Sequence, residues 1–336
     1  MPEVPEAGTT APLARPTVGD GLLVVDKPAG WTSHQVVARC RRLLGTRKVG
    51  HAGTLDPMAT GVLLIGVNKA TRLLGHLAGH DKTYLATVRL GQATVSDDAD
   101  GEVSSAPGAT GITEDQVRSA VAGFRGRISQ VPSAVSAIKV DGKRAYARVR
   151  AGEDVQLKAR EVTVSRFEVL DCRRALVASD REAEVGPDGE PLPVIDVDVV
   201  VDCSSGTYIR ALARDLGTVL GCGGHLIALR RTRVGAFDLS RPHLSAGELV
   251  SGDAVVALIG MAEVARACFP MVEVGDEGAR EVGFGRPLAV AVPGDPTAIL
   301  HGEQFLALYR SDGAGRAVPV AVFSPNDSPA AGGPRD

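Results

Sequence analysis

The stretch that decides how this chain is interpreted is GHAGTLDPMATG, residues 50–61. Its three glycines let the backbone approach a ligand closely, and it runs directly into the apolar stretch VLLIGV at 62–67. Asp56 is the single acid between residues 27 and 80. The same segment contains eight basic residues: Lys27, Arg39, Arg41, Arg42, Arg47, Lys48, Lys69 and Arg72. Its net charge is therefore +7, and the sequence places one carboxylate among cations.

The residues just before this loop predict a strand followed by a helix. Residues 21–26 are apolar, and Pro28 and Gly30 then interrupt the strand. Thr32 or Ser33 can cap a helix whose apolar residues recur at helical spacing. Those residues are Val36, Val37, Cys40, Leu43 and Leu44, and Gly45 ends the helix.

Further along, strand and helix patterns alternate irregularly. Residues 82–90 and 195–202 have the period of two that is typical of half-buried strands. Thr113 and Gln116 form a capping box for a helix that ends near residue 124, and residues 207–220 predict another helix. The acidic segment 179–193 reads as a surface loop. This order lacks the repeated units of a doubly wound parallel sheet, so we expect a mixed α+β fold.

The chain divides into five expected parts. Residues 1–19 and 324–336 are rich in Pro, Gly and Ala and predict disordered tails. Residues 20–240 are expected to form the main folded domain and residues 241–269 a helical connector. Short apolar pieces separated by glycines predict a small β-rich domain at 270–323.

Composition excludes several classes of protein. The 336 residues are 44% hydrophobic and 23% charged, as in a folded globular protein. No apolar run approaches the ~20 residues of a membrane helix, and the first residues lack the pattern of a secretory signal. The five cysteines are scattered and odd in number, which favours a reducing cytoplasm. Cys222 and His225 could form half of a metal site, but no nearby residues supply the other half.

The charge distribution indicates a polyanionic partner. The net charge is −3 overall, so the chain outside residues 27–80 carries −10. Two further basic stretches lie at 139–150 and 210–233. Basic patches of this kind bind nucleic-acid phosphates, although each could also be a solvated helix face.

Asp56 has two possible roles. A carboxylate close to Lys or Arg stays ionised, as a nucleophile or base requires. Asp before Pro is also a common turn former, so a purely structural role stays open. The loop does not match the phosphate-binding pattern of nucleotide triphosphatases.

Six segments, in order, resemble the bacterial tRNA pseudouridine-55 synthases. They are DKPAGWTSHQVV (26–37), GHAGTLDPMATG (50–61), KTY (82–84), VPSAVSAIKVDGKRAYARVRAG (131–152), SSGTYIRALARDLG (204–217) and GGHLIALRRTRVGAF (223–237). The resemblance covers about residues 20–240. It implies the pseudouridine-synthase fold, a mixed and mostly antiparallel sheet flanked by helices, with a small C-terminal β-rich domain. It also implies isomerisation of a uridine in the tRNA T-loop without metal or organic cofactor.

The resemblance assigns roles to individual residues. Asp56 matches the catalytic aspartate, which either adds to the sugar or removes a proton to give a glycal. Arg210 matches the arginine that pairs with it, although a phosphate contact or a surface position is the alternative. Tyr84 matches the aromatic that stacks on the target base, with core packing as the alternative. Tyr208 resembles a second pocket tyrosine and Leu229 an apolar contact to uracil.

Other residues are assigned to the surroundings of the site. By resemblance His51 contacts the nucleotide, and Lys27 supports the active-site loop. Candidate RNA-backbone contacts are Arg39, Arg41, Arg42, Lys139, Lys143 and Arg144.

The expected partner is the T-stem-loop of tRNA, bound by a cytoplasmic monomer with neither membrane nor guide RNA. Two alternatives remain: a relative that takes its target from a guide RNA, and a non-catalytic protein that binds or folds tRNA.

Overall fold

The computed structural model describes residues 18–133, 157–177, 191–252 and 256–323, together with the backbone of residues 139–140 and 143–144. The C-terminal tail predicted at 324–336 and almost all of the N-terminal tail predicted at 1–19 lie outside these residues. The same holds for most of the acidic segment 179–193 and for most of the basic stretch 139–150.

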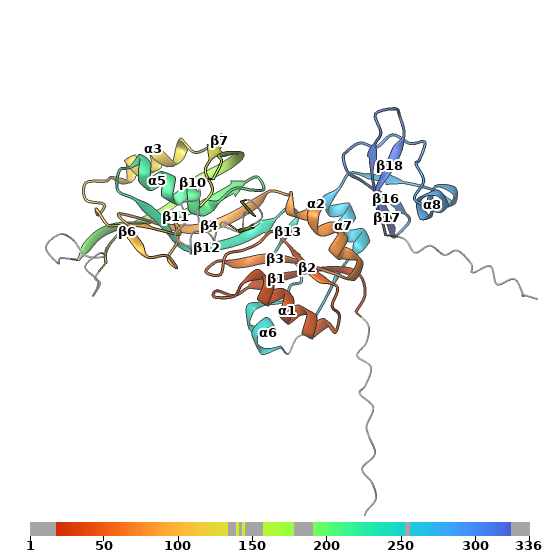
Figure 1. Ribbon diagram of the computed structural model, residues 1–336, viewed down its shortest axis with the longest axis horizontal. Coiled ribbons are helices and arrows are strands. Elements are labelled where there is room, and N and C mark those ends of the chain that lie inside the picture. The colour runs from red at the N-terminus through yellow and green to blue at the C-terminus, as the bar shows by residue number, and fades with distance from the viewer. Residues whose placement is uncertain are drawn as a thin grey trace, which may run out of the picture.

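A ten-stranded sheet forms the centre of the fold (Figure 1). Its strand order is β14-β1-β3-β12-β4-β11-β10-β7, with β2 paired to β3 and β13 paired to β12. The strands are β1 (Gly21–Lys27), β2 (Val49–Ala52), β3 (Thr60–Val67), β4 (Lys82–Leu90), β7 (Gly126–Gln130), β10 (Arg160–Val177), β11 (Leu192–Cys203), β12 (Gly224–Val234), β13 (Phe237–Asp238) and β14 (Ile259–Gly260). Among the described pairs of this sheet, β3 with β12 is parallel and the others are antiparallel. The predicted fold, mixed and mostly antiparallel, is confirmed.

Both faces of the sheet are covered near β1 and β3, whereas one face is more open near β4 and β11. In β1, Leu23 and Val25 belong to one buried cluster, and Leu22 and Val24 belong to the other. In β4, Tyr84, Ala86 and Val88 are buried and the alternate residues are more exposed, the period of two that the sequence shows. The alternation of apolar and polar residues in the sequence therefore identifies a strand that is covered on one face only.

Two helices begin at the capping residues that the sequence predicted. Helix α1 (Ser33–Leu44) starts with a complete Thr32/Gln35 capping box and ends at Gly45 in the left-handed conformation, with φ 64°. Helix α3 (Glu114–Ala122) has the predicted Thr113/Gln116 box. Helix α5 (Ile209–Val219) packs on the same face of the sheet as α1 and α3. The 3-10 helix η1 (Asn68–Leu73) and helices α2 (Leu74–Ala78) and α7 (Met261–Cys268) cover the opposite face.

A smaller C-terminal lobe, residues 271–323, lies at one end of the molecule beside α7 (Figure 1). Its four-stranded sheet has the order β15 (Met271–Glu273), β16 (Thr297–His301), β17 (Gln304–Ser311), β18 (Ala317–Val322), flanked by α8 (Asp276–Gly283). Phe305 and Leu308 share a buried cluster with Leu64 and Leu77 of the main body. Arg72 donates to the carbonyl of Val322 at 2.5 Å. The lobe is thus joined to the main body by apolar packing as well as by chain connection.

The remaining elements are short. They are the ladder of β5 (Ala93–Thr94) with β6 (Val103–Ser105), the ladder of β8 (Lys139–Val140) with β9 (Lys143–Arg144), and helix α6 (Ala246–Ser251). Within residues 241–269, where a helical connector was expected, α6 and α7 are accompanied by β14, which pairs with Gly21 and Leu22 of β1.

Two sequence expectations differ in detail from the structure. The glycine-rich loop is shorter than predicted, because its first residues belong to β2 and its last two, Thr60 and Gly61, open β3. Gly61 lies against β12: a Cβ there would come within 2.1 Å of the Arg231 carbonyl oxygen. The helix predicted from residue 207 begins at Ile209.

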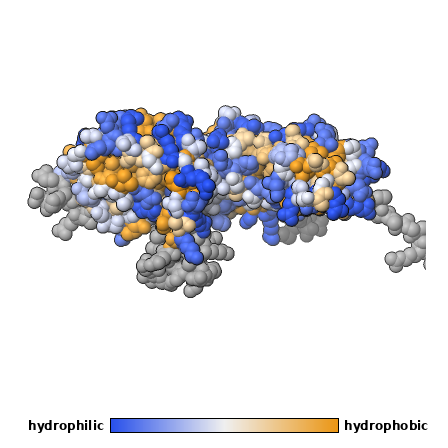
Figure 2. Space-filling model, turned by 90° about the horizontal axis from the view of Figure 1, so that it is seen from above, coloured by the Kyte–Doolittle hydropathy of each residue, from blue (hydrophilic) through white to orange (hydrophobic). Residues whose placement is uncertain are grey.

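The surface is mixed in polarity. Figure 2 shows hydrophobic residues interspersed with polar ones on both the main body and the C-terminal lobe. None of the helices in the described part of the chain has the length and hydropathy needed to cross a lipid bilayer.

The Thr32 capping box should contribute measurably to stability. Replacing Thr32 by Ala removes the hydroxyl that accepts from the Gln35 N–H at 3.2 Å. We expect the free energy of unfolding to fall by about 1 kcal/mol in urea denaturation. Thr110→Ala, at an exposed threonine, is the control and should change it by less than about 0.5 kcal/mol. Equal effects of the two substitutions would contradict a capping role.

Candidate active site

A cavity of about 330 Å³ opens between the glycine-rich loop and the start of α5. Strands β4 and β12 contribute its remaining walls. The lining residues are Gly53, Thr54, Leu55, Asp56, Ala78, Lys82, Tyr84, Gly206, Thr207, Tyr208, Ile209, Arg210, Leu229 and Arg231. Five residues proposed from the sequence are therefore brought together: Asp56, Tyr84, Tyr208, Arg210 and Leu229. The volume falls within the range of small-molecule sites.

Asp56 and Arg210 form a two-point ion pair across this cavity. The Nε of Arg210 lies 3.0 Å from Oδ2 of Asp56, and its Nη2 lies 3.2 Å from Oδ1. The Arg210 side chain is 5% exposed and that of Asp56 is 36% exposed. The guanidinium thus fixes the orientation of a carboxylate that stays accessible to a ligand.

Arg210 is held from its other side by residues that the sequence interpretation missed. Its Nη1 donates to the carbonyl of Ser96 at 2.8 Å and lies 3.3 Å from Oδ2 of Asp98, whose side chain is 7% exposed. Asp98 also accepts from the Asp100 N–H and the Ser96 hydroxyl. The acid run DDAD at 97–100 was the available signal, but nothing in sequence spacing connects it with Arg210, 112 residues later.

Tyr208 and Arg210 lie two residues apart in the sequence but differ in backbone conformation. Only Tyr208 is extended, with φ −101° and ψ 108°, and it is the N-cap of α5. Arg210 already lies in the first helical turn. Both line the cavity because the change from extended to helical backbone occurs between them.

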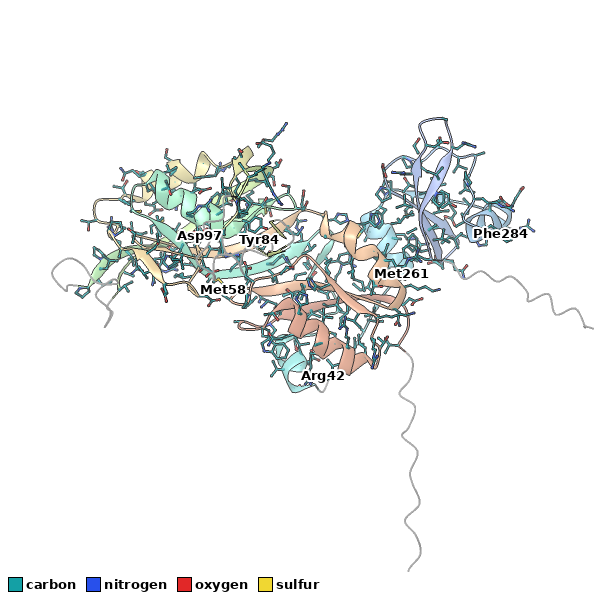
Figure 3. All side chains as sticks on the ribbon, in the orientation of Figure 1. Arg42, Met58, Tyr84, Asp97, Met261 and Phe284 are labelled. Carbon is teal, nitrogen blue, oxygen red and sulfur yellow. The ribbon has the colours of Figure 1, made fainter. Side chains whose placement is uncertain are left out.

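The remaining walls are aromatic and apolar. Tyr84, on β4, is 7% exposed, and Leu229, on β12, is equally buried. Figure 3 shows Tyr84 in the main body between β4 and the start of the helical layer. Burial raises the pKa of Tyr84, so its hydroxyl remains protonated at neutral pH. The cavity can therefore hold a flat, partly polar ring against aromatic and aliphatic surfaces.

Lys27 contacts the glycine-rich loop that carries Asp56. It is fully buried and does not line the cavity. Its ammonium donates to the carbonyls of Pro28 at 2.9 Å, Trp31 at 2.6 Å and Pro57 at 3.1 Å. The last contact ties the residue after Asp56 to the end of β1.

Arg231 is a second buried cation under the same loop, and it was not singled out from the sequence. Its guanidinium donates to the carbonyls of Val62 at 2.7 Å, Gly53 at 2.9 Å and Thr54 at 3.4 Å. The hydroxyl of Ser33 adds a contact with both the N–H and the carbonyl of Leu55. The main chain on both sides of Asp56 is thereby fixed by three side chains from other elements.

Lys82, the first residue of the KTY segment, lines the cavity and was also missed. Its Nζ donates to the carbonyls of Ala78 at 2.9 Å and His80 at 2.5 Å. Burial, with the nearby positive charge of Arg231, lowers its pKa to about 8. The sequence did not single out Lys82, because a lysine in an alternating strand is normally expected on the exposed face.

His51 lies beside the site and does not line the cavity. Its ring packs edge-on against His34 with centroids 5.5 Å apart, and burial lowers its pKa, which favours the neutral ring. Its Nδ1 is buried without a hydrogen-bond partner among the described residues. A contact with bound nucleotide remains a prediction.

The candidate RNA contacts differ in availability. Arg39 donates to the carbonyls of Leu249 and Val250 in α6, and Arg41 donates to the carbonyl of Val49. Arg42 is exposed near the end of α1, well apart from Tyr84 (Figure 3). Lys139, Lys143 and Arg144 lie in the β8–β9 ladder, and their side chains are outside the described residues. Arg39 therefore has a structural role in joining α1 to α6.

The possible half metal site at Cys222 and His225 is accounted for by packing. Both residues are buried, and Nδ1 of His225 lies 3.1 Å from the carbonyl oxygen of Gln92.

Comparison with known proteins agrees with this geometry. Residues 41–209 match the N-terminal domain of the TruB family pseudouridylate synthases, and residues 210–250 match the tRNA pseudouridylate synthase B C-terminal domain. A tRNA pseudouridine synthase B from Cutibacterium acnes is 55% identical over 312 residues, covering 91% of this chain and 99% of that protein. A tRNA pseudouridine synthase B from Arthrobacter sp. is 52% identical over 316 residues, covering 91% of this chain and 97% of that protein.

Solved structures show the same fold. A chain in a Cbf5-Nop10-Gar1 complex has a TM-score of 0.64 at 26% identity and covers 91% of this chain and 86% of its own length. A chain of an H/ACA RNP bound to a substrate RNA containing 2'-deoxyuridine has a TM-score of 0.63 at 25% identity, with the same coverage. Fold and cavity together define a pseudouridine synthase. Within that class, the chain belongs to the TruB family of pseudouridylate synthases.

The buried ammonium of Lys27 should make stability depend on pH in a defined direction. Burial lowers its pKa from 10.5 to about 8. Between about pH 8 and pH 10 the folded protein therefore binds fewer protons at this site than the unfolded chain, so the free energy of unfolding rises with pH. We expect the difference in unfolding free energy between wild type and Lys27→Met to increase over this window in urea denaturation.

Lys69→Met is the control for this measurement, because Lys69 is an exposed lysine with a side chain 44% accessible. Its difference from wild type should stay constant over the same pH window. A wild-type advantage over Lys27→Met that is flat or decreases with pH would show that burial does not shift this group.

Proposed function

We propose that this enzyme isomerises the uridine at position 55, in the T-loop of tRNA, to pseudouridine, with Asp56 as its catalytic residue. The observation that carries the proposal is the half-exposed Asp56 carboxylate, oriented by the buried Arg210 at 3.0 and 3.2 Å inside a cavity lined by two tyrosines. Family membership and relatives named tRNA pseudouridine synthase B, at 52–55% identity over most of the chain, support tRNA as the substrate.

The isomerisation requires a carboxylate near the ribose and an enclosed space in which the uracil can turn, and the cavity provides both. The bond from C1′ of the ribose to N1 breaks, the uracil turns in place, and C1′ joins C5. The proton on C5 leaves and N1 gains a proton, so atoms and electrons balance without an oxidant or reductant. Asp56 would act either by adding to C1′ or by removing a ribose proton to give a glycal. Tyr84, Tyr208 and Leu229 enclose the detached base while it turns.

The substrate uridine must leave its stack before Asp56 can reach it. Unstacking a base costs on the order of a few kcal/mol. Stacking on an aromatic such as Tyr84 recovers ~1–3 kcal/mol, and phosphate contacts supply further binding free energy. Recognition of this kind depends on RNA shape, backbone and splayed bases.

We place the catalytic domain at residues 20–240 and an RNA-binding-like domain at residues 270–323. The basic segment 27–80 supports an RNA surface that extends beyond the cavity. The enzyme would act as a monomer without a guide RNA, in the cytoplasm where its tRNA substrate is found. Cbf5 is solved in a complex with Nop10 and Gar1, whereas tRNA pseudouridine synthase B is the name carried by the more similar relatives.

Asp56→Asn separates catalysis from binding. The substitution removes one charge from a large RNA contact surface but takes away the reacting carboxylate. We expect tritium release from a tRNA transcript labelled at C5 of uridine to fall by at least about a thousandfold, with the dissociation constant for tRNA within about threefold of wild type. Asp115→Asn, at an exposed residue of α3, should behave as wild type. Normal turnover by Asp56→Asn would remove Asp56 from the chemistry.

The exposed end of α1 should contribute to RNA affinity through charge. Neutralising both Arg41 and Arg42 to Gln should weaken tRNA binding and reduce the slope of log K against log salt by about 1–2. Arg118→Gln, which removes an exposed arginine paired with Glu114 on α3, serves as a control for general charge loss. An unchanged slope in the double variant would exclude this helix from the RNA contact surface.

A further inference from the structure

A side chain from strand β7 of the main sheet holds the start of α5. Oε1 of Gln130 accepts from the Tyr208 N–H at 2.9 Å, and Nε2 of Gln130 donates to the Tyr208 carbonyl at 3.0 Å. One carboxamide thus satisfies both main-chain polar groups of a single residue, as a neighbouring β-strand would. Tyr208 is the N-cap of α5 and has no side-chain cap of its own.

Gln130 can fix the position of the Tyr208 main chain without contacting a ligand in the cavity. It is the last residue of β7, pairs with Arg160 of β10, and is 2% exposed. It does not line the cavity. Its buried amide and carboxamide oxygen both find partners in Tyr208, so a change of that contact would leave buried polar groups unpaired.

The next residue along the chain makes a second contact with the same helix. Arg214, one turn beyond Arg210, donates to the carbonyl of Val131 at 2.7 Å and to Oδ2 of Asp97 at 3.2 Å. Residues 130–131 therefore hold the first two turns of α5 at two points. Rotation or translation of this end of α5 would displace Tyr208 and Arg210 together, and with them the orientation of Asp56.

We propose that Gln130 is a positioning residue for the isomerisation: by bonding both main-chain groups of Tyr208, it sets the placement of Tyr208 over the base and of Arg210 against Asp56. This inference rests on the proposed function. It predicts an effect on turnover that exceeds any effect on RNA affinity, because the residue contacts neither RNA nor the reacting atoms.

The first test replaces Gln130 by Met, which keeps the approximate size and removes both hydrogen bonds. We expect kcat for tritium release from a C5-labelled tRNA transcript to fall about 10- to 100-fold, as for displaced catalytic groups, with KM within about threefold of wild type. Gln92→Met is the matched control. Gln92 is 3% exposed, its Nε2 has no partner among the described residues, and it does not line the cavity, so kcat should stay within about twofold of wild type.

The second test uses Gln130→Glu and pH. An ionised Glu can accept from the Tyr208 N–H but repels the Tyr208 carbonyl, whereas a protonated Glu regains a donor and restores both contacts. Burial raises the pKa of such a carboxyl. We therefore expect kcat of Gln130→Glu, as a ratio to wild type at each pH, to rise at least about threefold between about pH 8 and pH 6. If Gln130 acted only through packing, the ratio of the Gln130→Glu kcat to the wild-type kcat would not change with pH.

Each result decides the matter. A fall in kcat confined to Gln130→Met, or a ratio for Gln130→Glu that rises as pH falls, supports the inference. Wild-type kcat in folded Gln130→Met, or a ratio that is flat with pH, overturns it and leaves the proposed function standing. If Gln130→Met fails to unfold cooperatively, the pH ratio of Gln130→Glu carries the test. Absence of tritium release by the wild type overturns the proposed function and this inference with it.

Discussion

The contact on which the site depends is the one between the Arg210 guanidinium and two carboxylates. Arg210 pairs with Asp56 in the glycine-rich loop and lies 3.3 Å from Asp98 in a second loop, so one buried cation joins three segments that are far apart in the chain. Burying an isolated charge is costly, and pairing on both sides offsets much of that cost. The arrangement leaves Asp56 oriented and still accessible, which a reacting carboxylate requires.

Around this contact, cations act largely as main-chain supports. Lys27 donates to three main-chain carbonyls, one of which, that of Pro57, lies in the glycine-rich loop. Arg231 donates to three carbonyls in or next to the same loop. The positive charge of residues 27–80 is therefore divided: Lys27 is buried beside the loop, whereas Arg42 is exposed. A net charge summed over a segment does not separate these two kinds of cation, and only burial distinguishes them.

The structure also explains how a small cavity can act on a large RNA. The walls come from strands β4 and β12 of the main sheet, from the first turn of α5, which is anchored by Gln130 and Arg214, and from the glycine-rich loop, which is held by Lys27, Arg231 and Ser33. Rigid elements hold catalytic geometry better than loops do. The C-terminal lobe shares a buried cluster with the main body, so it extends the same rigid surface.

The sequence by itself determined the strands with a period of two, the capped helices at Thr32 and Thr113, the mixed α+β class, and, through six ordered motifs, the residues Asp56, Tyr84, Tyr208, Arg210 and Leu229. These follow from local rules and from motif order. Only the tertiary structure decided that Asp98, Lys82 and Arg231 belong to the site, that Arg39 is occupied by α6, and that Gln130 holds Tyr208. The physical reason is that each of these depends on a contact between residues distant in the chain: 112 residues separate Asp98 from Arg210 and 78 separate Gln130 from Tyr208, and no local pattern encodes which distant partner a buried polar group will find.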